Sequence, residues 1–123
     1  MPYFVKLPDH VGTSTEPPER YVNIVNGDST IAQRQLRRGG YAGYEVNTAA
    51  TLCALLQLVT EGRIGRPPEN EPTPGPTTFF DVGSNCGHFT LLIKGLWPDT
   101  KVVAFEPTPD THAWLSRVTR SNG

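Results

Sequence analysis

The sequence predicts a protein of the α/β class whose final third is a strand–helix–strand–helix unit. Two observations lead to this prediction. Apolar runs rich in β-branched and aromatic residues, at 78–82 and 101–106, alternate with helical patterns that begin near residues 88 and 108. A turn with two glycines joins the first run to the first helical pattern. Strands connected through helices in this way lie parallel, and their crossover is right-handed.

Length and charge restrict the classes of protein. At 123 residues the chain is one small domain or a piece of a larger one. Its 11 basic and 12 acidic side chains nearly cancel, so no electrostatic attraction to nucleic acid is predicted. Because 37% of the residues are hydrophobic and there are 12 prolines and 12 glycines, much of the chain is expected to form loops.

The N-terminus and the cysteines indicate the compartment. The first ten residues, MPYFVKLPDH, lack the charged start and apolar core of a signal peptide, and no apolar run approaches the ~20 residues that span a bilayer. Cys53 and Cys86 are too few for a disulfide framework and have no partners at metal-ligand spacing. We therefore expect a cytoplasmic protein with no membrane partner and no metal.

Residues 1–27 are predicted to be a proline-rich arm with a short strand. Residues 1–20 are polar and hold little to bury, which is typical of a loosely held arm. The stretch RYVNIVNGD alternates imperfectly and stops at the turn signal Asn26-Gly27, which predicts a short strand.

Residues 28–62 are predicted to be a helical segment with two helices. The first helix has Asp28 or Ser29 as its N-cap and ends at Gly39-Gly40. Its arginines favour a solvated helix face over the alternative of an anion site; they are Arg34, Arg37 and Arg38.

The second helix of this segment has the clearer pattern. Asn47 or Thr48 is its N-cap, and Gly62 lies where a terminating glycine belongs. Cys53 lies beside its apolar face and is interpreted as a small buried hydrophobe. That face consists of Leu52, Leu55, Leu56 and Val59, at helical spacing.

Residues 63–77 are predicted to be an exposed linker, because five prolines exclude a helix or a central strand. The domain that begins after it, residues 78–123, starts with a strand at Thr78–Val82 and a helix at His88–Leu96. The second strand, Lys101–Glu106, has the composition of a strand buried on both faces.

The final helix is predicted to start at Thr108-Pro109-Asp110. Thr108 is its N-cap, proline is favoured at the first helical position, and an acid in the first turn complements the helix dipole. Its inner face is formed by Trp114, Leu115 and Val118.

The glycine turn after the first strand is the predicted ligand site, because parallel α/β units bind ligands outside the carboxyl ends of their strands. Gly83 and Gly87 allow positive φ and close approach of a ligand, and Asn85 tolerates the left-handed region. The first amides of the following helix suit a carboxylate or a phosphate. Twenty-five residues after Asp81, Glu106 ends the second strand, where a carboxylate can accept hydrogen bonds from a ribose diol.

Two common nucleotide motifs do not fit this turn. The dinucleotide pattern read from Gly83 requires glycine at positions 85 and 88, where the sequence has Asn85 and His88. A phosphate-binding P-loop requires Gly-Lys-Ser/Thr, which does not follow. A nicotinamide-dinucleotide-binding domain stays open as an alternative.

The letters D-x-G-x-N-x-G-x-x-T from Asp81 to Thr90, followed by Phe105-Glu106-Pro107, resemble the FkbM-type S-adenosylmethionine-dependent methyltransferases. That family has the signature D-V-G-x-N-x-G-x-x-T and a second strand ending in F-E-P. The good match covers 79–123, and a looser one reaches back to about Asp28 through Tyr44-Glu45.

The resemblance implies a Rossmann-like class I methyltransferase fold, of which this chain would hold the first βαβα unit after a helical N-terminal segment. It implies S-adenosyl-L-methionine as the cofactor, with its ribose hydroxyls on Glu106. The cofactor-binding residues that it implies are Asp81, Gly83, Asn85, Gly87, Thr90 and Glu106.

The reaction implied is methyl transfer to a hydroxyl of a small-molecule or glycan acceptor, such as a sugar or another natural product. Family members have about seven strands, and the match here ends after the second strand–helix pair. We therefore expect the N-terminal part of such an enzyme, inactive by itself, and we name no catalytic residue. The alternative is a non-catalytic remnant that binds cofactor weakly or not at all.

Simpler roles stay open for several residues. Asp81 can cap the turn by accepting backbone amides, and Glu106 can be a solvated strand end. His88 is interpreted as a surface residue of the first helical turn rather than a general base, and Cys86 as a small residue that fits the loop. Tyr44 and Glu45, from the N-terminal segment, can face the cofactor.

Overall fold

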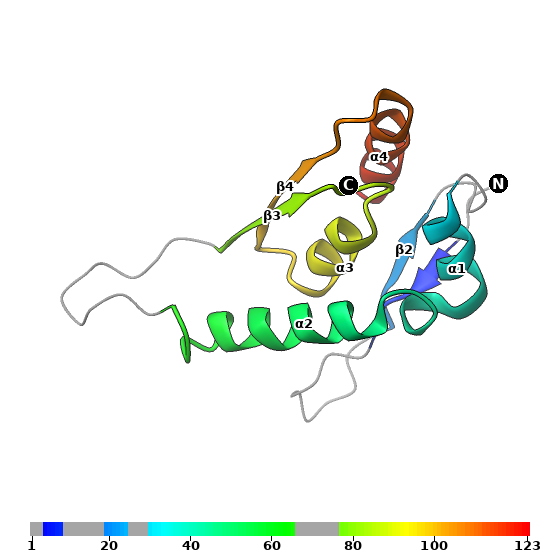
Figure 1. Cartoon of the computed structure of the whole chain (residues 1–123). Helices are drawn as coiled ribbons and strands as arrows, with labels where there is room; N and C mark the ends of the chain where they lie inside the picture. Colours follow the sequence, from blue (N-terminus) through cyan, green and yellow to red (C-terminus); the bar gives the residue numbers. More distant parts are fainter. Residues whose placement is uncertain (1–3, 9–18, 25–29, 66–76) are drawn as a thin grey trace.

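The computed structural model describes residues 4–8, 19–24, 30–65 and 77–123. These residues form a mixed α/β structure with two small sheets, β1 with β2 antiparallel and β3 with β4 parallel (Figure 1). In chain order the elements are β1 (Phe4–Lys6), β2 (Tyr21–Asn23), α1 (Ile31–Gly39), the 3₁₀ turn η1 (Gly40–Ala42), α2 (Val46–Thr60), β3 (Thr78–Val82), α3 (His88–Leu96), β4 (Lys101–Phe105) and α4 (Pro109–Asn122).

The predicted strand–helix–strand–helix unit is confirmed as β3, α3, β4 and α4. β3 and β4 pair in parallel, with Phe80 opposite Val103 and Asp81 opposite Ala104. α3 contacts both strands and covers one face of the pair. The carboxyl ends of the strands therefore lie side by side, next to the start of α3, where the sequence places the candidate site (Figure 1).

The other face of this sheet is apolar and exposed. Phe80, Val82 and Phe105 are 61%, 80% and 48% exposed. The prediction that residues 101–106 form a strand buried on both faces is therefore wrong within the part of the chain that the structure describes. The reason is that no described helix lies over the face that carries these three side chains, whereas α3 lies over the opposite one.

Residues 4–8 correct the prediction of a loosely held arm, while residues 1–3 and 9–18 of that arm lie outside the described residues. Residues 4–6 form β1, which pairs with β2, and the Leu7 amide donates to the Arg20 carbonyl at 2.8 Å. Val5 and Leu7 are almost fully buried, because the hairpin packs them into the core. The short strand predicted after Arg20 is confirmed as β2, and the predicted turn at 26–27 lies outside the described residues.

α1 begins one or two residues later than predicted, with Thr30 as its N-cap in place of Asp28 or Ser29. The Thr30 hydroxyl accepts from the Gln33 amide, and the Gln33 side chain accepts from the Thr30 amide, which is a complete capping box. The predicted caps, residues 28 and 29, lie outside the described residues. The predicted end at Gly39-Gly40 is confirmed, and the three arginines are exposed on the outer surface of the helix.

α2 differs from its prediction in its cap and in its buried face. Its N-cap is Glu45, in the left-handed conformation at φ 48°, not Asn47 or Thr48. Of the predicted apolar face, Leu56 is buried and Leu52 and Val59 are half-buried, whereas Leu55 is 47% exposed and Ala49 is buried in addition. Gly62 has φ 66° just beyond the helix, as predicted. Residues 66–76 of the predicted linker lie outside the described residues.

The core joins the N-terminal hairpin and α1 to the C-terminal unit. Leu92 and Ile93 of α3 and Val118 of α4 have no exposed surface. Cys53 is half-buried and packs against this core, which agrees with its interpretation as a small hydrophobe. The buried core cluster consists of Val5, Leu7, Val22, Ile24, Leu36, Tyr41, Ala49, Leu91, Leu92, Leu96 and Val118.

Candidate functional site

The turn between β3 and α3 has three residues with positive φ. These are Gly83 at 81°, Asn85 at 50° and Gly87 at 84°. A side chain at Gly83 would meet nothing within 4 Å, so the backbone there is open to a ligand. A Cβ at Gly87 would lie 2.9 Å from Cδ1 of Leu115, so this glycine also lets α4 pack against the turn.

Asp81 lies at the end of β3 and is buried. Its Oδ2 accepts from the Thr90 amide at 3.0 Å and from the Thr90 hydroxyl at 2.5 Å. Thr90 is the third residue of α3, and Gly87, the N-cap, has no side chain to satisfy that amide. Asp81 therefore caps α3 from the neighbouring strand, which is the simpler of the two roles considered for it. A cofactor contact of Asp81 or Thr90 stays a prediction.

Glu106 lies just beyond β4, and its carboxylate connects the two strand ends. Oε2 accepts from the Asn85 amide at 3.0 Å, and Oε1 accepts from the Thr108 amide at 2.8 Å. The pKa of Glu106 is lowered, mainly because its carboxylate accepts hydrogen bonds from Thr108. The side chain is therefore ionised at neutral pH. These bonds do not use all four lone pairs of the carboxylate, so it can still accept a hydrogen bond from a ligand.

Ser84 is a structural residue of the site that sequence reasoning missed. Its hydroxyl donates to the Asp81 carbonyl at 2.6 Å and accepts from the Phe105 amide at 3.0 Å. The amides of Gly83 and Ser84 both donate to the Phe105 carbonyl. These bonds hold the ends of β3 and β4 together. A small polar residue directly after Gly83 was the available signal.

His88 is buried, not on the surface as predicted. The side chain is 4% exposed, and its ring contacts the rings of Tyr41, Tyr44 and Phe89 at centroid distances of 4.9, 5.1 and 4.5 Å. Neither ring nitrogen has a hydrogen-bond partner among the described residues. Burial lowers the pKa of His88 to about 4, so the imidazole is neutral at physiological pH.

The segment 41–45 therefore lies against the first turn of α3. The Tyr41 hydroxyl donates to the His88 carbonyl at 3.3 Å, and Tyr44 contacts the edge of the His88 ring. Glu45 is one of two described non-glycine residues with positive φ, and Asn85 is the other. Cys86 is buried and burial raises the pKa of its thiol, which agrees with its interpretation as a small residue that fits the loop.

The structure thus brings the six predicted site residues to one edge of the sheet. Asp81 and Thr90 contact each other, and Asn85 and Glu106 contact each other across the two strand ends. Among the described residues there is no group of His, Cys, Asp and Glu that could hold a metal ion. No described helix has both the length and the apolar character to cross a bilayer.

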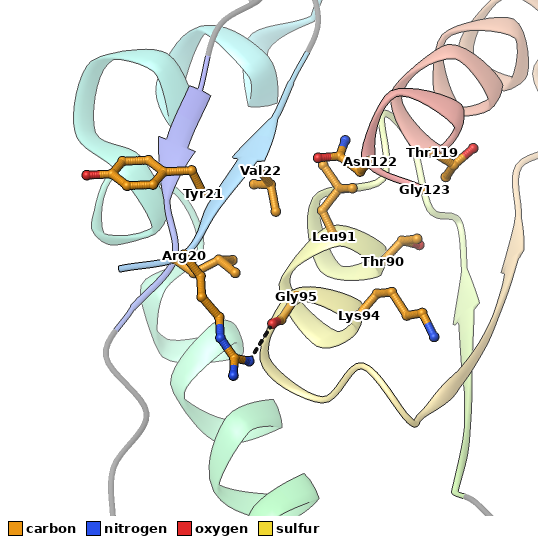
Figure 2. A pocket seen from close by; sticks show the side chains of 11 residues that line it. Arg20, Tyr21, Val22, Thr90, Leu91, Lys94, Gly95, Thr119, Asn122 and Gly123 are labelled. Carbon is orange, nitrogen blue, oxygen red and sulfur yellow. Dashed lines mark hydrogen bonds between the residues drawn. The ribbon is translucent and has the colours of Figure 1, made fainter. Parts of the chain in front are cut away.

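A cavity of about 360 Å³ lies nearby, between β2, α3 and the end of α4 (Figure 2). The two basic side chains that line this cavity, Arg20 and Lys94, do not point into it together. Figure 2 shows them pointing to different sides of α3. Arg20 Nη1 donates to the carbonyls of Gly95 and Leu96, and Lys94 donates to the carbonyls of Pro98 and Thr100. Both cations therefore stabilise the end of α3 and the turn that follows it.

Two curated proteins are similar to part of the chain. Methyltransferase 1 of Beauveria bassiana is 39% identical over 46 residues, which are 37% of this chain and 18% of the relative. Methyltransferase sdnD of Sordaria araneosa is 41% identical over 44 residues, which are 36% of this chain and 17% of the relative. The chain therefore covers less than a fifth of the length of these relatives. No protein-family model and no solved structure matches it. The two names support a methyltransferase family.

Proposed function

We propose that this chain belongs to an S-adenosylmethionine-dependent methyltransferase of FkbM type with a Rossmann-like fold. The names of the two partial relatives support the reaction type. The observation that carries the proposal is the Glu106 carboxylate, which is held at the end of β4 by the Asn85 and Thr108 amides. An anchored carboxylate beside an open glycine turn is what a ribose-containing cofactor requires.

The residues present fit such a cofactor. The remaining lone pairs of Glu106 can accept hydrogen bonds from the two ribose hydroxyls. Gly83 leaves open space at the turn, and the neighbouring Asn85 is exposed, so the backbone can approach the methionine half of the cofactor. No Lys or Arg follows the turn until Lys94, which agrees with a cofactor that has no phosphate.

When bound, the cofactor would supply an activated methyl group on a sulfonium for in-line transfer to an acceptor oxygen, with S-adenosylhomocysteine as the leaving group. The reaction needs alignment of two reactants and exclusion of water more than a nucleophilic side chain. In this chain, Glu106 would orient the cofactor, while Asp81 and Ser84 keep the turn rigid through their bonds to Thr90 and Phe105. The acceptor is a hydroxyl of a sugar or another natural product, as the family resemblance implies.

Calorimetry with S-adenosylhomocysteine tests the cofactor assignment. We expect saturable binding to the protein and weaker binding of NAD. Glu106→Ala should weaken binding of S-adenosylhomocysteine by roughly ten- to a hundredfold, the range for hydrogen bonds to a charged group. Glu106→Gln should lose less, because one acceptor oxygen remains.

Asp110→Asn is the matched control, because Asp110 is an exposed acid in the first turn of α4. This variant should bind like the wild type. Tighter binding of NAD would favour a nicotinamide domain. No binding of either ligand would favour the non-catalytic alternative, and wild-type affinity in Glu106→Ala would overturn the ribose assignment.

A further inference from the structure

A second cavity, of about 380 Å³, lies between η1, the end of α3 and the side of α2 that runs from Val46 to Gln57. Four separate segments form its walls, so it is concave and not a single flat face. Its lining residues are Pro8, Tyr41, Ala42, Val46, Ala49, Ala50, Cys53, Ala54, Gln57, Leu96 and Trp97.

The side of α2 that lines the cavity consists mostly of small residues, together with Val46 and Gln57. Ala49, Ala50 and Ala54 line it, whereas the larger Leu55 lies on another side of the same helix and is 47% exposed. Tyr41 and Trp97 also line the cavity. The short side chains of the three alanines leave space there for a small molecule.

Among the residues that the structure describes, no charged side chain lines this cavity. The Tyr41 hydroxyl is engaged, since it donates to the His88 carbonyl. Burial raises the pKa of the Cys53 thiol, so the thiol is protonated and behaves as an apolar wall. The Gln57 side chain, which donates to Glu61 Oε1 at 2.8 Å, is the remaining polar side chain of the described lining. A charged ligand would lose its hydration here without gaining a partner, so the lining selects an uncharged one.

We propose that this cavity is a binding site for an uncharged, largely apolar small molecule of one or two rings. Its volume falls in the range of small-molecule pockets, roughly 300–1,000 Å³. It is too small for a protein helix, whose diameter with side chains is about 10 Å. The proposal concerns binding alone and does not depend on the proposed methyl transfer.

Binding is tested with N-phenyl-1-naphthylamine, an uncharged two-ring fluorophore. The experiment uses Trp114→Phe protein, in which Trp97 of the cavity wall is the single tryptophan and therefore the single donor for energy transfer to the bound probe. We expect saturable transfer with one probe per chain. Ala50→Phe, which fills the cavity, should weaken binding at least tenfold.

Two variants are the controls. Thr51→Phe adds the same ring on the adjacent, exposed position of α2, outside the cavity, and should bind like the parent protein. Phe80→Ser removes an exposed ring from the open sheet face and should also leave binding unchanged. Absence of saturable transfer, undiminished binding in Ala50→Phe, or loss of binding in Phe80→Ser would each overturn the proposal.

A measurement on the unmodified chain covers the case in which Ala50→Phe does not fold. Cys53 lines the cavity and is half-buried, so its alkylation by a maleimide can be followed by peptide mass spectrometry. Saturating probe should slow modification of Cys53 at least tenfold. Unchanged modification of Cys53 while the probe is bound would place the probe elsewhere and contradict the proposal.

Discussion

The side-chain amide of Asn122 pairs with the backbone of Asn23 as a neighbouring strand would. Asn122 Oδ1 accepts from the Asn23 amide at 2.7 Å, and Asn122 Nδ2 donates to the Asn23 carbonyl at 2.8 Å. The two residues are 99 positions apart. The pair joins the last turn of α4 to the edge of β2 that β1 leaves open, so it connects the N-terminal hairpin to the C-terminal unit.

Asn122→Ala should destabilise the protein by about 1–2 kcal/mol, because three hydrogen bonds to backbone groups are lost, two to Asn23 and one to the Val118 carbonyl. The free energy of unfolding, measured by urea titration, reports the change. Arg120→Ala, an exposed change in the same helical turn, should cost less than about 0.5 kcal/mol. Equal losses in the two variants would show that the Asn122–Asn23 pair carries no stability.

Gly87→Ala and Gly83→Ala separate backbone strain from packing. Both glycines have positive φ, so each alanine should cost about 1–2 kcal/mol of conformational strain. At Gly87 the added methyl also meets Leu115 at 2.9 Å, whereas at Gly83 it meets nothing within 4 Å. We therefore expect Gly87→Ala to lose about 1–3 kcal/mol more than Gly83→Ala in the same urea titration. Equal costs would contradict the predicted clash with Leu115.

Asp81→Ala should destabilise the cofactor-free protein by about 2–3 kcal/mol, since it leaves the buried Thr90 amide and hydroxyl without their acceptor. Asp81→Asn, which keeps one acceptor oxygen, should lose less. Asp99→Ala is the control, because Asp99 is an exposed acid in the turn before β4. The unfolding free energy is measured without ligand, so a stable Asp81→Ala protein would contradict the capping role independently of cofactor binding.

Burial of His88 should make stability depend on pH. The folded pKa is about 4, below the unfolded value of about 6.5, so the unfolded chain binds more protons between these pH values. Stability is therefore fully present above about pH 6.5 and is lost as the pH falls toward 4. The loss from this group is on the order of 3 kcal/mol.

His88→Phe keeps a ring between Tyr41 and Tyr44 but cannot titrate, so its unfolding free energy should fall less over the same pH range. His112→Gln removes an exposed histidine of α4 and should retain the wild-type slope. The measurement is urea titration at several pH values between 4 and 7.5. If the unfolding free energy of His88→Phe fell with pH as steeply as that of the wild type, another group would be the cause of the acid sensitivity.

Local sequence determined the C-terminal unit. The bounds of β3 and α3 follow from short-range signals, which are a β-branched and aromatic run and apolar residues at helical spacing. The same holds for the start of α4 at Pro109 and for the positive φ of Gly83, Asn85 and Gly87. These features depend on backbone sterics within a few residues, which a sequence displays directly.

Only the tertiary structure decided which residues these elements bury and what their polar groups bind. β1 exists because a partner strand about fifteen residues later pairs with it, and the proline-rich sequence between them conceals that pairing. His88 is buried because the rings of Tyr41 and Tyr44, more than forty residues earlier in the chain, pack against its ring. Likewise, the Glu106 carboxylate meets the Asn85 amide only when β3 and β4 pair in register. Each of these contacts joins positions that are distant in the sequence. They form because burial and strand pairing in the assembled fold stabilise them, and these contributions outweigh the local preferences of the chain.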